Sequence, residues 1–461
     1  MKPNYHSIMN NQHFLLISLP AQGHINPTLQ LAKNLTRAGA RATFATTVAG
    51  LSSLTARPTL NGLFFASFSD GTEETVKDDA ADLSAYLTKV KHVGSQSLAN
   101  LIHNLSSDGK PVTFLLYPYL LPWAAAVARE CQVSSALLAI QSATCFAIYH
   151  RFFNGHDGLF DGEKDTNPSI SIKLPGLSLL TSNDLPSFLL PTDKYYSSLI
   201  PTFREHIQTL EKDPHPCVLV NSFDALEAAS ITAVDNMDVI SIGPLVPSAF
   251  SDGNDCSDRS FGCDLFRSSG DYVQWLDSKP EGSVIYVSFG SFVALEKRQR
   301  EEILKGLVEG DRPFLWVNRD GEGEEKKGCG EDGLIVPWCS QMEVLCHRSV
   351  GCFVTHCGWN STLESLVAGV PVVGCPRMAD QMTNAKLLEE VWGTGLRAAV
   401  NEEGMVEKEE IKRCLDTLMG GGERGKEIRQ NAIKWKGLAM EAVKEGGSSH
   451  NNLKQFLKRL G

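Results

Sequence analysis

Residues 353–365 read FVTHCGWNSTLES and place a histidine, a cysteine, a tryptophan, an asparagine and a glutamate where a strand gives way to a helix. Residues 352–355, CFVT, form a short apolar, β-branched run that is typical of a buried strand. Ser361 and Glu364 have the spacing of a capping box that opens the helix TLESLVAG. Because a helix N-terminus presents unpaired N–H groups and the positive end of the dipole, the stretch predicts an anion site. A well-capped helix beside a buried aromatic side chain is the alternative.

Short apolar runs alternate with amphipathic helical patterns along the whole chain. In the first half, the runs that predict strands lie at residues 13–19, 41–47, 112–117 and 135–140. After residue 270, a second series lies at residues 283–289, 314–318, 334–337, 351–355 and 371–374. Continuous apolar strands between amphipathic helices indicate a parallel sheet that is covered on both faces. The predicted fold class is therefore α/β, with two doubly wound, Rossmann-like domains whose strand ends face one cleft.

The boundary between the two series is marked by composition. Residues 242–262 are rich in Pro, Gly, Ser and Asp, which is typical of a linker between domains. We therefore expect a first domain at residues 1–241 and a second domain at residues 263–440.

The charge and cysteine content exclude several classes of protein. The 461 residues carry 43 Lys and Arg against 54 Asp and Glu, a net charge of −11, which argues against binding to nucleic acid or to an anionic membrane. The first apolar run, residues 14–21, is too short for a membrane helix and lacks the flanks of a signal peptide. The twelve cysteines form no CxxC pair and are expected to be reduced thiols. We therefore expect a cytosolic protein without membrane insertion.

The common nucleotide and catalytic motifs are missing. The chain has no GxGxxG after a strand, no GxxxxGK[ST] and no GxSxG, which argues against NAD, P-loop and hydrolase sites. His356 and Cys357 are adjacent at a strand end, so their side chains point in opposite directions and do not predict a nucleophile pair. His347, Cys352, His356 and Cys357 do not have the spacing of a zinc site either.

Residues 338–381 carry a specific resemblance. They read WCSQMEVLCHRSVGCFVTHCGWNSTLESLVAGVPVVGCPRMADQ and resemble the full signature box of the plant family 1 UDP-sugar glycosyltransferases. The resemblance extends over nearly the whole chain, through PAQGHINP, NSFDALE, IGPL, YVSFGS and FLWVNR. It implies a GT-B fold in which a final helix, at about residues 441–461, crosses back to the first domain. The likeness is greatest to the branch that glucosylates phenolics, flavonoids and small carboxylic acids.

The resemblance implies how the box would hold the nucleoside. Trp338 would stack on uracil, although a core aromatic is the structural alternative. The backbone of Cys339 and the side chain of Gln341 would meet the edges of the nucleoside, and Glu364 would accept hydrogen bonds from the two ribose hydroxyls. This role of Glu364 competes with the capping box, because one side chain does not serve both fully.

The diphosphate and the sugar are assigned in the same way. His356, Asn360 and Ser361 would hold the diphosphate at the helix N-terminus. Ser291 of YVSFGS would help them, with a simple turn residue as its alternative. The remaining three positions, which would contact the sugar, are Trp359, Asp380 and Gln381.

The residues at the sugar positions favour glucose. In the family, Trp359 and a terminal Gln381 go with UDP-glucose rather than with the galactose or glucuronic acid donors. The box departs from the family pattern at Cys375 and Met378, where aromatic residues are common. These two residues would either loosen the sugar pocket or repack it.

His24 resembles the general base of the family. Asn26 and Pro27 fit the N-cap and the first position of a helix, so we expect His24 just before that helix at the end of the first strand. An imidazole with a pKa near 6.5 can take a proton from an acceptor hydroxyl near neutral pH.

The usual aspartate partner of this histidine is absent. Pro118 occupies its position, and no acidic residue lies between Lys110 and Arg129. Because a carboxylic acid or an acidic phenol is largely ionised at neutral pH and needs little help from a base, the gap favours acidic acceptors. The alternative is that another carboxylate, or water, orients His24 in the folded protein.

Together these features predict an inverting glucosyltransferase that uses UDP-glucose and needs no metal or other cofactor, because helix-end donors neutralise the leaving diphosphate. The product would be a β-glucoside or a glucose ester of a small acceptor. Residues 51–70 and 155–187 are expected to be the variable loops that build the acceptor pocket. A monomer is expected. The rivals are a non-catalytic UDP-sugar-binding protein and a nicotinamide-dependent oxidoreductase.

Overall fold

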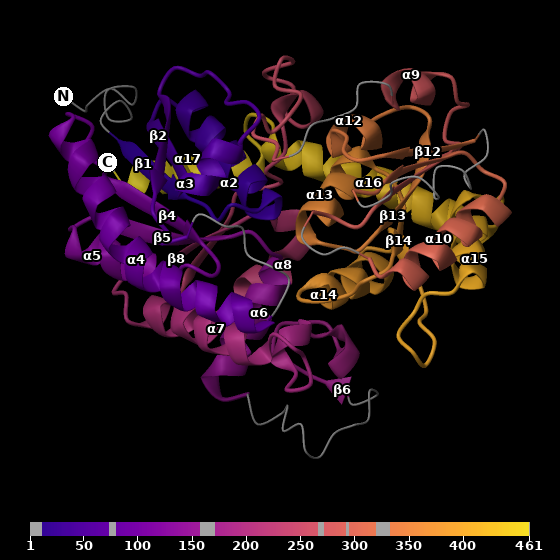
Figure 1. The fold of residues 1–461 in the computed structure, drawn as a ribbon, viewed down its shortest axis with the longest axis horizontal. Helices are drawn as coiled ribbons and strands as arrows, with labels where there is room; N and C mark the ends of the chain where they lie inside the picture. The colour runs from indigo at the N-terminus through magenta and orange to yellow at the C-terminus, as the bar shows by residue number, and fades with distance from the viewer. Residues whose placement is uncertain are drawn as a thin grey trace. The chain divides into compact units, whose positions relative to one another are not determined.

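The computed structural model describes residues 12–72, 80–156, 171–265, 272–291, 295–319 and 332–460. The chain divides into two compact units (Figure 1). Unit 1 comprises Met1–Val246, Phe261–Leu265 and Ala442–Gly461, and unit 2 comprises Pro247–Ser260 and Phe266–Glu441. The boundaries expected from the sequence, and a cleft between the units, stay predictions.

Unit 1 contains a seven-stranded sheet in which every pair of neighbours is parallel. The strands, in spatial order, are β3 (Leu63–Phe68), β2 (Arg41–Thr47), β1 (His13–Ile17), β4 (Phe114–Pro118), β5 (Ser134–Ala139), β8 (Cys217–Val220) and β9 (Asp238–Ser241). Every residue of β1 and β4 is buried, as the continuous apolar runs predict. The order of connections reverses between β1 and β4, so the carboxyl ends of these two strands form the switch point at which such sheets bind ligands.

The helices of unit 1 lie between these strands in the chain, except for the last, which follows all of them. They are α2 (Gln22–Arg37), α3 (Val48–Ser53), α4 (Ala80–Ser107), α5 (Trp123–Glu130), α6 (Ala143–Arg151), α7 (Tyr196–Glu211), α8 (Asp224–Thr232) and the C-terminal α17 (Ser448–Arg459). A short antiparallel pair, β6 (Ser171–Ile172) and β7 (Leu180–Thr181), lies apart from the main sheet.

Two expectations for unit 1 are wrong. Strand β3 occupies residues 63–68 of the segment that was expected to be a loop, since its partly buried apolar residues pair with β2. Helix α2 begins at Gln22 rather than after Asn26, because the N–H groups of both His24 and Ile25 bond to the carbonyl of Ala21 and close the first turn early. Of residues 155–187, the other expected loop, residues 157–170 lie outside the described part of the chain.

The C-terminal helix α17 packs on the sheet of unit 1. The ring of Phe456 lies edge-on to Phe114, with centroids 5.4 Å apart, and 6.4 Å from the ring of Phe14. Gln12 donates a hydrogen bond of 3.3 Å to the carbonyl of Leu457. The last helix therefore completes the core beneath β1 and β4.

Unit 2 contains a six-stranded parallel sheet. Its strands, in spatial order, are β12 (Gly333–Val336), β11 (Phe314–Val317), β10 (Val284–Ser288), β13 (Val350–Thr355), β14 (Val372–Gly374) and β15 (Gly395–Arg397). Its helices are α9 (Tyr272–Asp277), α10 (Lys297–Glu309), α12 (Gln341–Leu345), α13 (Trp359–Ala368), α14 (Gln381–Lys386), α15 (Lys408–Met419) and most of α16 (Glu423–Val443). Five of these strands coincide, within two residues at each end, with the runs predicted from the sequence.

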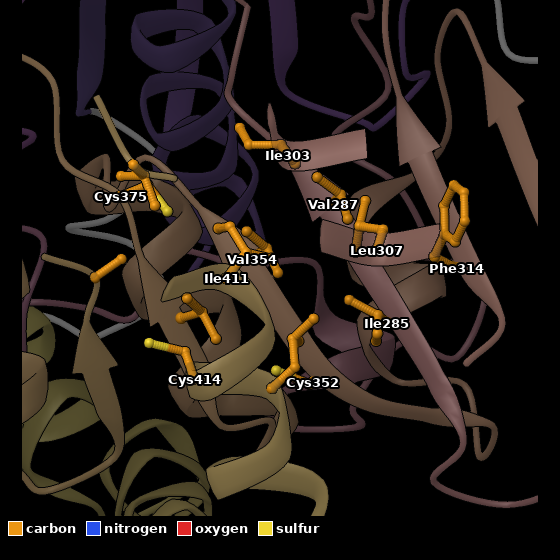
Figure 2. Packing of buried hydrophobic residues seen from close by; sticks show 14 of the residues in the cluster. Ile285, Val287, Ile303, Leu307, Phe314, Cys352, Val354, Cys375, Ile411 and Cys414 are labelled. Carbon is orange, nitrogen blue, oxygen red and sulfur yellow. The ribbon is translucent and has the colours of Figure 1, made fainter. Parts of the chain in front are cut away.

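One face of the unit 2 sheet is covered by α10 and α15, which pack against each other (Figure 1). Figure 2 shows Ile303 and Leu307 of α10 and Ile411 of α15 lying on Ile285 of β10 and Val354 of β13. All five side chains are fully buried or nearly so. This core holds the strands rigidly, and so fixes the loops that leave their carboxyl ends.

Within the described residues the cysteines are free thiols. In the same part of the chain, no helix is both long enough and apolar enough to cross a membrane.

Candidate functional site

The residues singled out in the box lie after the carboxyl ends of the strands of unit 2. Because parallel strands end at the same edge of a sheet, residues that are far apart in sequence share that edge. Ser291 follows β10, Trp338, Cys339 and Gln341 follow β12, His356 to Glu364 follow β13, and Asp380 and Gln381 follow β14.

Helix α13 begins earlier than the capping box requires. Its N-cap is Gly358, which makes no side-chain cap, and its first residue is Trp359. Ser361 and Glu364 therefore lie inside the helix, and the capping-box prediction is wrong. The cause is the backbone of Cys357, whose φ of 63° turns the chain into the helix directly after β13. Glu364 is consequently free of any capping role, and the open N–H groups of the first turn face the sheet edge.

The His356 ring is held between two glycines. A Cβ atom on Gly290 would lie 2.7 Å from His356 Nε2, and a Cβ atom on Gly358 would lie 2.5 Å from it. His356 Nδ1 lies 3.2 Å from the hydroxyl of Thr355. Burial lowers the pKa of His356 to about 4, against a backbone hydrogen bond with Ser288 that raises it. The ring is therefore neutral at physiological pH and carries a single N–H.

Gln341 is the centre of a partly buried hydrogen-bond network. Its Nε2 donates to Ser361 Oγ at 2.9 Å and to Glu364 Oε2 at 2.8 Å, and its Oε1 accepts from the hydroxyl of Tyr286 at 3.2 Å. Burial raises the pKa of Glu364 to about 7, while the bond from Gln341 lowers it. Gln341 of α12 thus links Ser361 and Glu364 of α13, and their contacts to a ligand stay predictions.

Asp380 and Gln381 begin α14 with oriented side chains. Asp380 is buried, and its Oδ2 accepts a hydrogen bond of 2.8 Å from Asn384. The Oε1 atom of Gln381 accepts from the N–H groups of Arg377 and Met378, at 2.9 and 3.1 Å. Both side chains are therefore oriented at the sheet edge by hydrogen bonds within the protein, and their contacts to a sugar stay predictions.

The other residues of the box divide between packing and exposure. Trp359 is buried, and its ring lies 6.1 Å from that of Trp392. Trp338 and Asn360 are half-buried. Cys357 is fully buried beneath the helix start, and burial raises the pKa of its thiol to about 12, so it contributes packing rather than a nucleophile.

His24 lies in the first turn of α2, next to the switch point of the unit 1 sheet. Burial is the only cause acting on its pKa, which it lowers to about 4. Its buried Nδ1 has no hydrogen-bond partner among the described residues. Pro118 is buried at the end of β4, and the register Leu16↔Leu116 brings this end beside the end of β1. No described carboxylate therefore takes the place of the missing aspartate as a charge partner of His24.

The segment after Pro118 is held by a residue that the sequence did not indicate. Leu120 has a φ of 73°, and its N–H donates to His206 Nε2 at 3.0 Å. The His206 ring lies parallel to that of Tyr117, at 6.2 Å and 4°. Burial lowers the pKa of His206 to about 3, so the ring stays neutral and keeps its acceptor nitrogen. Nothing in the helical pattern of residues 196–211 separates this histidine from a core residue.

Tyr286 is the second residue that sequence reasoning missed. It is a buried side chain in the middle of β10, and its hydroxyl must find a polar partner there. That requirement is the signal that could have pointed to it.

Among the described residues, no group of three or more His, Cys, Asp or Glu side chains could hold a metal ion.

The chain is similar to proteins that use UDP. The sequence model of "UDP-glucoronosyl and UDP-glucosyl transferase" matches residues 223–434. The chain is 51% identical to UDP-glycosyltransferase 75C1 of Solanum lycopersicum, over 98% of this chain and 99% of that protein. It is also 51% identical to crocetin glucosyltransferase, chloroplastic, of Gardenia jasminoides, over 98% of each chain. The crystal structure of Os79 from O. sativa in complex with UDP matches with a TM-score of 0.87 at 34% identity, over 97% of this chain and 100% of that chain.

The structural match confirms the predicted fold class. Both the seven-stranded and the six-stranded sheet are parallel α/β sheets of the GT-B type, and the long C-terminal helical segment is present as expected.

Proposed function

The chain belongs to the family of UDP-glucuronosyl and UDP-glucosyl transferases, and we propose that it transfers glucose from UDP-glucose to an acidic oxygen of a small phenolic, flavonoid or carboxylic acid acceptor. Membership makes it a UDP-dependent glycosyltransferase. This favours an enzyme over the two rivals, a non-catalytic UDP-sugar-binding protein and a nicotinamide-dependent oxidoreductase. A cytosolic location and a monomeric state stay predictions, and one relative is named as chloroplastic.

The donor site is proposed at the carboxyl edge of the unit 2 sheet. UDP would lie across the first turn of α13, with the diphosphate against His356, Asn360 and Ser361 and the ribose against Glu364. Members of the family use a UDP-sugar without a metal cofactor. In this chain, the first turn of α13 would supply the positive potential and the backbone N–H donors that the leaving diphosphate needs, and the neutral His356 would add one N–H donor.

The sugar is proposed to be glucose. Trp359 and Gln381 stand at the positions that go with this sugar, and a relative at 51% identity is named a glucosyltransferase. The Oε1 atom of Gln381 already accepts hydrogen bonds from the backbone N–H groups of Arg377 and Met378. The NH₂ group of this amide is therefore the part that could donate to a sugar hydroxyl.

The observation that carries the acceptor class is the environment of His24. With a pKa lowered to about 4 by burial and no described carboxylate to raise it, His24 is a weak base. A weak base is poorly matched to an aliphatic alcohol, whose proton is held tightly. A carboxylic acid with a pKa of about 4 has already lost its proton at neutral pH and needs no base. The site therefore suits acceptors that arrive ionised or ionise readily.

In the proposed reaction, the acceptor oxygen attacks the anomeric carbon from the face opposite UDP. The new C–O bond forms as the bond to the β-phosphate oxygen breaks, and UDP leaves with the electron pair. A single displacement inverts the anomeric centre and yields a β-glucoside or a β-glucose ester. With an ionised acceptor no proton moves, whereas with a neutral phenol the proton goes to His24.

The test is a panel of acceptors that share a ring and differ in acidity: a benzoic acid, a phenol and a benzyl alcohol. Each is incubated with UDP-glucose, and a mass gain of one hexose is read by mass spectrometry. We expect turnover to fall in that order. His24→Ala should reduce kcat/KM by a large factor on the phenol and by a small factor on the acid. Equal large losses on both acceptors would refute the proposed acceptor class, and no mass gain with any acceptor would refute glucosyl transfer.

A further inference from the structure

Tyr286 lies in the centre of the unit 2 sheet, directly beneath the proposed donor site. It belongs to β10 and is paired in register with Phe353 of β13, and the two rings stack with centroids 4.9 Å apart and planes 18° apart. Only 1% of the tyrosine is exposed. Its hydroxyl lies 3.2 Å from Gln341 Oε1 and 3.5 Å from Cys339 Sγ. A buried hydroxyl so placed has a specific partner rather than solvent.

The Gln341 amide has a different partner at each end. Its Nε2 has two hydrogens, which go to Ser361 Oγ and to Glu364 Oε2, and its Oε1 accepts the hydrogen of Tyr286. If the amide turned over, its oxygen would face the carboxylate of Glu364, which offers only lone pairs when ionised. The ionised carboxylate therefore selects the orientation in which Oε1 faces the tyrosine, and the hydroxyl of Tyr286 donates to Oε1 in that orientation.

We propose that Tyr286 is a positioning residue for the UDP-sugar, because its hydroxyl fixes the Gln341 amide that in turn holds Ser361 and Glu364 in the arrangement that receives the nucleoside diphosphate. The inference rests on the proposed donor site and adds a residue to it. Tyr286 would touch no substrate itself, since its side chain is buried and its hydroxyl lies against Gln341 and Cys339. Burial also raises the pKa of Tyr286 well above its usual value, so the hydroxyl keeps its proton and stays a donor at neutral pH.

Tyr286→Phe tests the proposal with little disturbance of the core. The phenyl ring keeps the stacking on Phe353, and only the hydroxyl is lost. We expect KM for UDP-glucose and Kd for UDP, by titration calorimetry, to rise by about two- to tenfold, which is the usual worth of one neutral hydrogen bond. We expect kcat and the acceptor KM to stay within about twofold of the parent, since a general loss of packing would move all of them.

Tyr272→Phe is the matched control. Tyr272 is also a buried tyrosine, and its hydroxyl donates to Glu343 Oε2 at 2.8 Å and accepts from the N–H of Ser340 at 3.3 Å. It therefore supports the same helix, α12, but does not touch the Gln341 amide. We expect an unchanged KM for UDP-glucose. A rise equal to that of Tyr286→Phe would overturn the proposal, because any loosening of α12 would then suffice.

A double-mutant cycle separates this inference from the donor site on which it rests. If Tyr286 acts through Gln341, then Tyr286→Phe has no further effect in a Gln341→Ala background. Multiplying effects would overturn the proposal. If Gln341→Ala weakens UDP binding and Tyr286→Phe does not, only the inference fails. If Gln341→Ala leaves UDP binding unchanged, the proposed donor site fails at Gln341 and the inference fails with it.

Discussion

Replacing Gly358 by alanine perturbs the proposed diphosphate site by one methyl group. The backbone of Gly358 has a φ of −59° and a ψ of 147°, which any residue adopts without strain. The cost therefore comes from the methyl group alone. A Cβ atom there would lie 2.5 Å from His356 Nε2 and 3.1 Å from its Cε1, so the imidazole has to move.

The magnitude follows from two terms. Rotating His356 about 30° out of its rotamer costs about 0.5–1.5 kcal/mol, and this falls on the stability of the protein. Losing its hydrogen bond to a charged diphosphate costs about 1.5–3 kcal/mol, and this falls on binding. We therefore expect KM for UDP-glucose and Kd for UDP to rise by about 10- to 150-fold, with a Tm that falls by only a few degrees.

The assay measures Kd for UDP by titration calorimetry, KM for UDP-glucose at saturating acceptor, and Tm. Gly422→Ala is the control, since Gly422 lies between α15 and α16 with no atom within 4 Å of its Cβ position. It should leave all three values near those of the parent. A Gly358→Ala variant that binds UDP within about twofold of the parent would refute the reasoning, because His356 would then not contact the diphosphate.

Three further predictions address other parts of the chain. Burial raises the pKa of Glu364 to about 7 from its usual 4.5. Between pH 4.5 and pH 7 the folded state therefore holds a proton that the unfolded state has lost. This contribution to stability is thus lost as pH rises from 4.5 to 7. KM for UDP-glucose, measured from pH 6 to 8, should fall as the carboxylate of Glu364 forms. In Glu364→Gln, KM should not depend on pH over this range. A KM of the parent that does not change with pH would argue against ribose binding by Glu364. His206→Phe removes the nitrogen to which the Leu120 N–H donates, and it should destabilise unit 1 by about 1–3 kcal/mol in a denaturant titration. It should also raise KM for the acceptor substrate and leave KM for UDP-glucose unchanged. A change in KM for UDP-glucose alone would contradict this. Phe456→Ala should lower the free energy of unfolding by about 3–5 kcal/mol, because the buried ring of Phe456 packs against Phe14 and Phe114. A loss below about 1 kcal/mol would show that the core of unit 1 does not need α17.

Local patterns predicted most strands of the two main sheets but missed β3, β8, β9 and β15, and they misplaced the helix starts. Strand β2 spans residues 41–47, as its run predicts, because a buried strand of a parallel sheet is apolar throughout and this can be read from neighbouring residues. Strand β3 was missed because its face is only partly buried, and its pairing with β2 is not a local property. The start of α2 was misplaced because Pro27, a residue typical of a first turn, lies inside the helix.

For the proposed donor site, the order of residues along the box was enough to predict which side chains share one sheet edge. The motif of residues 338–381 names them, and the parallel topology then brings the ends of β10, β12, β13 and β14 to that edge. Their partners were not predictable. The Tyr286 to Gln341 to Glu364 network joins β10, α12 and α13, and no spacing in the sequence encodes a contact between side chains from three elements.

The sequence alone therefore determined the fold class, the family and the residue types at the site, because these depend on periodicity and on a long specific motif. Only the tertiary structure decided how those residues are charged and held. The pKa values of His24, His356 and Glu364 are moved chiefly by burial, and burial is produced by elements that are distant in the chain. The stretch FVTHCGWNSTLES thus predicted an anion site on a helix. Packing around it placed the helix start at Trp359 and made the His356 imidazole neutral.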